Sequence, residues 1–136
     1  MVVESSVNEN ELKKRTKQFG LRVIKLVESL PNGQTSRTIG NQLLRSGMSV
    51  GANHRAACRG RSKADFIAKA GISLEEADEC LYRMELLQEA GIVPVDNLKD
   101  LMKEADELVA IFTASIKTAR AHLNQKPSIS NPQSKF

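Results

Sequence analysis

The chain has 136 residues, the size of one domain with one continuous core. Only 4% of its residues are aromatic and none is Trp, while most of the 40% hydrophobic fraction is Leu, Ile, Val and Ala, which favours packed helices over a β-sandwich. The net charge is a modest +4, no apolar run could cross a membrane, and the polar N-terminal residues do not resemble a signal peptide, so we expect a cytoplasmic all-α protein without a membrane contact.

The first amphipathic segment spans residues 9–30. Leu12, Thr16, Phe19 and Val23 recur at spacings of three and four, which places them on one stripe of a helix. The sequence Pro31-Asn32-Gly33 then breaks the pattern, because proline cannot continue a helix. We therefore predict a helix that buries this stripe.

A second helix is predicted over residues 35–59, with two neighbouring stripes. One is a narrow core stripe that runs from Ile39 to Ala57. The other is rich in glycine, and glycines stacked at helical spacing let another backbone approach closely. We interpret this second stripe as a packing face, either within the bundle or between subunits. It contains Gly40, Leu44, Gly47, Gly51, His54 and Cys58.

A tight turn separates the second helix from a third, predicted over residues 62–90. Gly60 is expected to end the second helix in the left-handed conformation. Ser62 and Asp65 have the spacing of a helix N-cap. Because the turn is short, we expect the two helices to be antiparallel neighbours.

The fourth helix is predicted over residues 96–123, after a break at Gly91 and Pro94. Its apolar residues form a nearly perfect heptad from Leu98 to Ala119. Long helices joined by short loops are typical of an antiparallel up-down-up-down four-helix bundle. We therefore expect residues 1–123 to form this bundle and residues 124–136, which hold two prolines and few apolar residues, to be a disordered tail.

The predicted bundle carries no recognisable catalytic or cofactor-binding motif. A di-metal carboxylate site needs Glu-x-x-His pairs, and neither His54 nor His122 has a Glu three residues before it. Cys58 and Cys80 fall within helical patterns and lack the close spacing of a metal or redox motif, so we expect two buried free thiols. We expect no catalytic residue, no metal and no cofactor.

Charge is distributed unevenly along the chain. Residues 36–69 hold seven Lys or Arg against one acid, whereas residues 70–107 hold eleven acids against three bases. We interpret the acids of the third helix as partners of basic residues on a neighbouring helix or subunit, or as a solvated face. The candidate subunit-interface residues are these acids and the glycine stripe: Glu75, Glu76, Glu79, Gly40, Leu44, Gly47, Gly51 and His54.

Basic side chains gather on the second helix, opposite its core stripe. Arg45, Arg55 and Arg59 share this outward direction, and Arg61 and Lys63 extend the patch across the turn. Such a basic ridge can neutralise phosphates and bind nucleic acid with little sequence preference. No aromatic residues interleave with the arginines, which argues against stacking of single-stranded bases. The alternatives are a solvated face and a subunit interface with the acidic third helix.

The stretch from Ile39 to Ile92 resembles a bacterial four-helix bundle family first noticed as reading frames within intervening sequences of 23S ribosomal RNA genes. The chain departs from the usual pattern of that family at His54, where Tyr is common, and at Arg83, where many relatives have Trp. The matching residues are Gln42-Leu43-Leu44-Arg45-Ser46, Gly51-Ala52-Asn53, Arg55 with Ala57, Ser62-Lys63, Asp65-Phe66, Glu76 with Glu79, and Leu81-Tyr82 before Glu85-Leu86-Leu87.

The resemblance implies a homo-oligomer, with a pentameric ring as the expected assembly, and no assigned cellular role. A distant branch of similar bundles serves reverse transcriptases of diversity-generating retroelements and presents a positive surface to RNA and polymerase. We therefore expect a non-catalytic oligomeric bundle whose basic ridge binds RNA or a nucleic-acid enzyme such as a reverse transcriptase. The alternative is an interaction module whose basic and acidic helix faces pair between subunits, with no nucleic-acid role.

Overall fold

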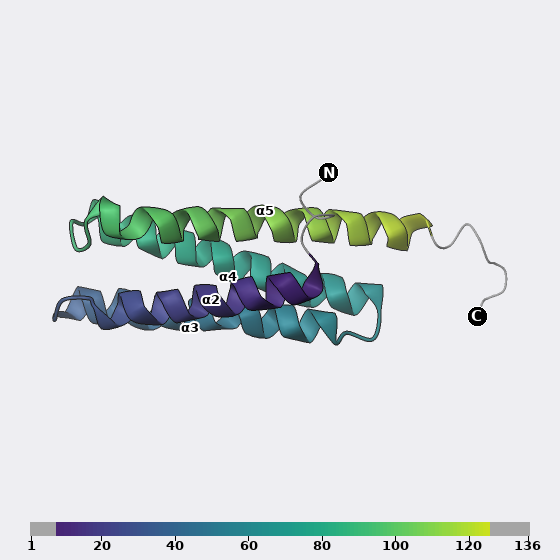
Figure 1. The fold of residues 1–136 in the computed structure, drawn as a ribbon, viewed down its shortest axis with the longest axis horizontal. Helices are drawn as coiled ribbons and strands as arrows, with labels where there is room; N and C mark the ends of the chain where they lie inside the picture. The colour runs from purple at the N-terminus through teal and green to yellow at the C-terminus, as the bar shows by residue number, and fades with distance from the viewer. Residues whose placement is uncertain (1–7, 126–136) are drawn as a thin grey trace.

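A computed structural model describes residues 8–125 of the chain (Figure 1). Four helices follow one another: α2 (Glu9–Glu28), α3 (Gln34–Cys58), α4 (Lys63–Glu89) and α5 (Val95–Gln125). The chain reverses direction at each loop, so consecutive helices are antiparallel (Figure 1). The predicted all-α four-helix bundle is confirmed. Helix α5 continues through Gln125, so the predicted tail begins too early, and its remaining residues, 126–136, lie outside the described part of the chain.

The ends of the helices are set by local hydrogen bonds. Asn8 caps α2 by accepting a hydrogen bond from the Glu11 amide at 2.8 Å. Ser62 caps α4 as predicted, because its Oγ accepts from the Asp65 amide at 3.0 Å. Gly91 follows α4 with a φ of 74°, a conformation that glycine adopts without a steric penalty.

The predicted left-handed conformation of Gly60 is wrong. Among the glycines between residues 8 and 125, only Gly33 and Gly91 have positive φ. Gly60 is needed for a different reason, since an added Cβ would lie 2.9 Å from Asp65 Oδ2 and 3.0 Å from the Ala57 carbonyl oxygen. The turn between α3 and α4 is therefore tight because of close packing.

One continuous apolar core fills the space between the helices. The predicted stripes on α2 and α5 are buried, and Phe19 and Phe112 are among the largest fully buried side chains. Cys80 of α4 is fully buried, as expected for a buried free thiol, whereas Cys58 is only half-buried. Ser73 of α4 is also fully buried, which the apolar pattern did not predict. Ser73 can be buried because its hydroxyl donates a 2.8 Å hydrogen bond to the Val50 carbonyl oxygen.

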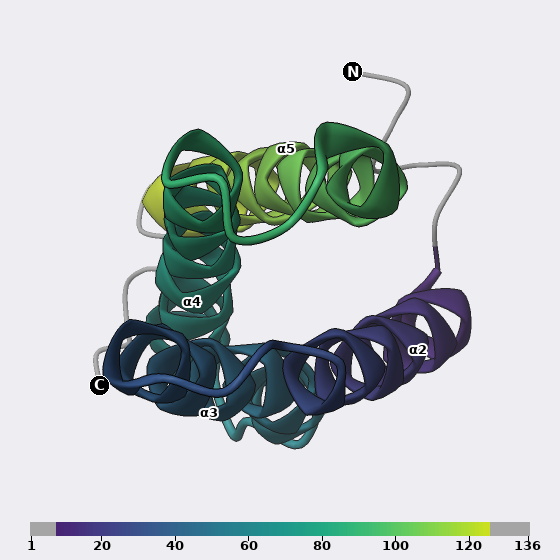
Figure 2. The same ribbon diagram turned by 90° about the vertical axis from the view of Figure 1, so that its left-hand side faces the viewer.

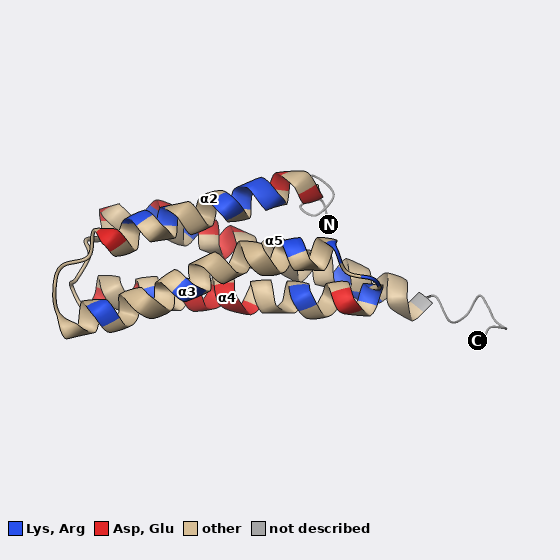
Figure 3. Cartoon of the chain, turned by 90° about the horizontal axis from the view of Figure 1, so that it is seen from below, with Lys and Arg blue, Asp and Glu red and all other residues tan. Residues whose placement is uncertain are grey.

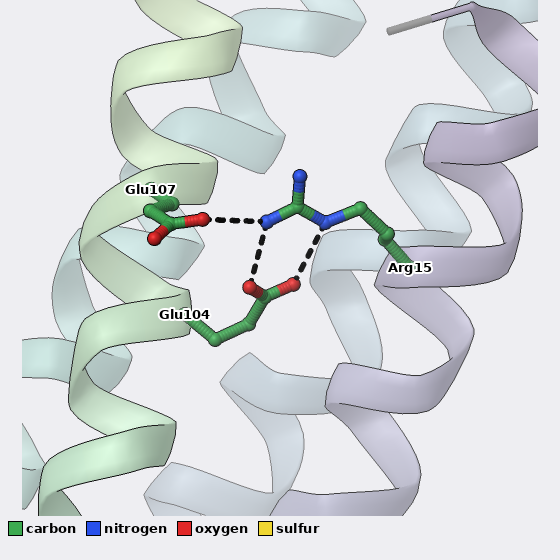
Figure 4. A network of polar contacts seen from close by, with 3 residues as sticks. All are labelled: Arg15, Glu104 and Glu107. Atoms are coloured by element: carbon green, nitrogen blue, oxygen red, sulfur yellow. Dashed lines mark hydrogen bonds and ion pairs between the residues drawn. The ribbon is translucent and has the colours of Figure 1, made fainter.

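The bundle is open on one side. Helices α3 and α4 share the most extensive interface, whereas α2 and α5 share the smallest and are set wide apart in the end-on view (Figure 2). Arg15 of α2 spans this side and contacts two carboxylates of α5 (Figure 4). Its guanidinium donates to Glu104 at 2.7 and 3.0 Å and to Glu107 at 3.0 Å. The hydrogen bond with Glu104 is the main reason that the pKa of Arg15 is raised.

Candidate nucleic-acid interface

The glycine stripe of α3 packs against α2 of the same chain. A Cβ added to Gly47 would lie 2.7 Å from Val23 Cγ1, and one added to Gly51 would lie 3.2 Å from Thr16 Oγ1. Of the two roles that the sequence left open for this stripe, the structure places it within the bundle. The assignment of Gly40, Gly47 and His54 to a subunit interface is wrong, because contacts inside one chain bury them. Leu44 and Gly51 are half-buried.

His54, near the end of α3, contacts the start of α2 and the middle of α5 at this packing face. Its Nε2 lies 3.4 Å from the Glu9 carbonyl oxygen and 3.5 Å from the Cys58 sulfur. Its ring meets the ring of Phe112 edge to face, with 5.7 Å between centroids. The imidazole thus occupies a buried position in contact with residues of α2 and α5. Burial lowers its pKa, an effect to which the charge of Lys13 adds.

The buried His54 should make the stability of the bundle depend on pH. Because the pKa of His54 is lowered in the folded state, the unfolded chain binds more protons than the folded chain at pH values between the lowered pKa and about 6.5. The free energy of unfolding should therefore be highest above pH 6.5 and fall as the pH drops through this window. Urea denaturation at several pH values between 5 and 7.5 measures this slope. His54→Gln should flatten it, and an unchanged slope would contradict the assignment.

The close approach of α2 and α3 leaves a groove of about 680 Å³ on the outside of the bundle. Among the residues that the structure describes, five cationic residues line it and no acidic residue does. Figure 3 shows the Lys and Arg of α2 gathered along that helix. We call this surface the α2–α3 groove. Its cations are Lys13, Lys14, Lys17, Arg55 and Arg59; its apolar residues are Leu21, Ile24 and Met48; Gly20, Gly47, Gly51 and Ala52 are its smallest residues.

The structure divides the predicted basic ridge. All five of its residues are exposed, but only Arg55 and Arg59 line the α2–α3 groove. Arg61 and Lys63 line a separate pocket at the end of the bundle, near Cys58 and His122. Arg45 is on the same helix stripe as Arg55 and Arg59 but lies outside the residues that line the groove. Within the described part of the chain, none of these five predicted residues forms an ion pair within 4 Å.

The lysines of α2 are the site residues that the sequence reading missed. Lys13, Lys14 and Lys17 face the arginines of α3 across the groove. Their signal was present in the sequence, because Lys14, Lys17, Leu21 and Ile24 repeat at the helical spacings of three and four. Helical spacing places these residues on one stripe, but it does not show which helix lies beside them.

Within the described part of the chain, the three predicted interface acids of α4 form no ion pair with the basic ridge. Glu75 is exposed, and one oxygen of the Glu76 carboxylate is buried without a hydrogen-bond partner. Glu79 instead contacts Arg83 of its own helix at 3.2 Å. Arg83 also donates to Gln42 of α3 at 3.1 Å, so this residue ties α4 to α3 by polar contacts.

A second exposed stripe runs along α4 and mixes apolar with acidic residues. Ile72, Glu75, Glu79, Tyr82 and Leu86 repeat at spacings of three and four, so they share one face of the helix. All five are exposed, and among the three apolar residues Tyr82 is the most exposed, with 58% of its surface accessible. We call this set the α4 stripe. Exposed large apolar residues in a row are typical of a surface that contacts a partner.

Between residues 8 and 125, no three or more His, Cys, Asp or Glu side chains are gathered so that they could hold a metal ion. Burial raises the pKa of the Cys80 thiol to about 12 and also raises that of Cys58, which disfavours the reactive thiolate. None of the described helices combines the length and the hydropathy of a bilayer span.

Comparison with known proteins gives two findings. A family model described as "23S rRNA-intervening sequence protein" matches residues 8–114. The chain is also similar to a crystal structure of a protein of unknown function from the S23 ribosomal protein family of Bacteroides thetaiotaomicron VPI-5482. The two are 34% identical with a TM-score of 0.75, and the match covers 80% of this chain and 97% of that one. No curated protein matches the chain.

Proposed function

Because the chain belongs to the 23S rRNA-intervening sequence protein family, and a solved relative has no known function, we propose a function from the surface of the chain itself. The protein is a non-catalytic helical bundle that binds RNA through phosphate contacts in the α2–α3 groove. The observation that carries this proposal is a groove that five cations line, with no acid among its described lining residues.

The arrangement of charge in the groove suits a phosphate backbone. Lysines on one wall and arginines on the other can contact phosphates from both sides. No ion pair within the described part of the chain occupies these cations, so binding does not first have to break one. If each neutralises one phosphate, the logarithm of the binding constant should fall with the logarithm of salt concentration with a slope of roughly −4.

Charge reversal in the groove should weaken RNA binding and its dependence on salt. We expect the triple variant Lys17→Glu, Arg55→Glu, Arg59→Glu to lose at least about thirtyfold in affinity, because three phosphate contacts become repulsive. The salt slope should become shallower by about 2 to 3. Filter binding of a structured RNA at two salt concentrations measures both quantities.

A matched control keeps the same change in net charge away from the groove. Lys103→Glu, Lys117→Glu, Arg120→Glu alters three exposed cations of α5. This control should retain most of the affinity and nearly the whole salt slope. Equal losses of RNA affinity in the two triple variants would show that net charge alone, and not the groove, determines binding. A flat salt response of the unaltered protein would remove the RNA proposal.

A second candidate function is pairing between subunits of a homo-oligomer, such as the ring that the family resemblance implies. The α4 stripe favours it, because exposed apolar residues alternate there with acids that could meet the cations of the groove in a second subunit. Light scattering on the same triple variants separates the candidates. Dissociation of the groove variant into monomers favours pairing, whereas loss of RNA binding with the oligomer intact favours the nucleic-acid function.

A further inference from the structure

The α2–α3 groove has a cationic end and an apolar end. Along α2 the lysines occupy residues 13–17, and the apolar residues Leu21 and Ile24 follow one turn later. Gly47 packs on Val23 and Gly51 packs on Thr16, so the antiparallel register brings Met48 beside the apolar part of α2. In the same register Arg55 lies beside Lys13, and Arg59 lies beside the start of α2. Charge and apolar surface therefore occupy different lengths of one groove.

An uninterrupted RNA duplex would leave the apolar end without a role. An A-form duplex presents phosphates and 2′-hydroxyl groups on its outside, and neither gains from contact with Leu or Met. Yet Leu21 is 49% and Met48 50% exposed, and both line the groove. An unpaired base is different, since its two faces are apolar and pack well against aliphatic side chains. A Met thioether adds a favourable contact with an aromatic ring.

Building on the RNA-binding function proposed above, we propose that the groove takes an unpaired nucleotide together with its neighbouring phosphates. The cationic end holds the phosphates and the apolar end covers a face of the base. The preferred ligand is then an RNA with a bulge or a loop. The lack of aromatic residues in the groove is compatible with this, because a single base rests on aliphatic side chains and no run of stacked bases is required.

Three hairpins of otherwise identical sequence test the inference. One has a single-nucleotide bulge, the second lacks the bulge, and the third keeps the bulged backbone with an abasic site. The unaltered protein should bind the bulged hairpin roughly threefold to thirtyfold more tightly than either of the others. The abasic hairpin separates contact with the base from a bend in the backbone.

The double variant Leu21→Ser, Met48→Ser tests the apolar end of the groove, because it removes the two exposed apolar side chains and keeps the cations. Both residues are half exposed, so the bundle should fold, which circular dichroism checks. This variant should bind all three hairpins alike, with an affinity for the uninterrupted hairpin within about twofold of the unaltered protein, because the cations are untouched.

The outcomes keep this inference apart from the proposed function. Equal binding of the three hairpins by the unaltered protein would overturn the inference and leave RNA binding in place. Binding to none of them would overturn both. If the serine variant keeps its preference for the bulge but loses mass in light scattering, the apolar end contacts protein and the inference is again overturned. The hairpin comparison on the unaltered protein stands even if the serine variant fails to fold.

Discussion

Replacing Phe112 with Ala should destabilise the bundle by about 3 to 5 kcal/mol. Phe112 is 1% exposed, and its ring meets the buried ring of His54 edge to face. Removing the ring takes away its apolar contacts and leaves a cavity between α5 and α3, which a tightly packed core cannot close fully. Urea denaturation followed by circular dichroism measures the loss in the free energy of unfolding.

The neighbouring Thr113 provides the control for this substitution. It is exposed, and its hydroxyl donates only to the Val109 carbonyl oxygen of its own helix. Thr113→Ala should therefore change the free energy of unfolding by no more than about 0.5 kcal/mol. The comparison must be made at one protein concentration, because any self-association adds to apparent stability. A loss below about 1 kcal/mol for Phe112→Ala would show that the core is not packed as described.

Replacing Gly47 with Leu should cost about 3 kcal/mol or more. The first added carbon alone would lie 2.7 Å from Val23 Cγ1 and 2.9 Å from Val23 Cβ. Val23 is fully buried and branched at Cβ, so it cannot turn aside easily. The gain of about 1 kcal/mol that a helix makes when glycine is replaced is too small to compensate. The same urea denaturation measures the net effect.

Gly71 is the matched glycine for this experiment. It also lies within a helix, but a Cβ added there has no atom within 4 Å. Gly71→Leu should leave stability unchanged or raise it by up to about 1 kcal/mol, because only the helix preference changes. If the two glycines respond alike, the close approach of α2 and α3 is not what requires Gly47. Since that approach shapes the α2–α3 groove, Gly47→Leu should also weaken RNA binding.

Local periodicity accounts for the parts of the fold that were predicted. The stripes from Leu12 to Val23 and from Leu98 to Ala119 are apolar at helical spacing, and such spacing identifies a buried face without knowledge of the partner helix. The burial of Ser73 was not predicted, because it does not follow from the spacing of residues within its own helix. Its burial depends on the Val50 carbonyl oxygen, a group on another helix that no local pattern of residues reveals.

Only the part of the candidate site that depends on a single helix was predicted. Arg55 and Arg59 stand on an exposed stripe opposite the core, and this direction can be worked out from α3 alone. Arg61 and Lys63 were grouped with them because they follow in sequence, but both line a different pocket beyond the tight turn. A turn redirects side chains, so closeness in sequence does not place them on one surface.

The sequence by itself determined the four helices, the short loops between them, and the apolar stripes of α2 and α5. Only the tertiary structure decided that the glycines of α3 meet Val23 and Thr16 of α2, and hence that the lysines of α2 lie opposite the arginines of α3. The physical reason is that the helical repeat depends on residues three or four apart, whereas pairing and register depend on how whole side-chain surfaces fit together. The charged face of one helix follows from its own residues, whereas a groove forms only between two helices.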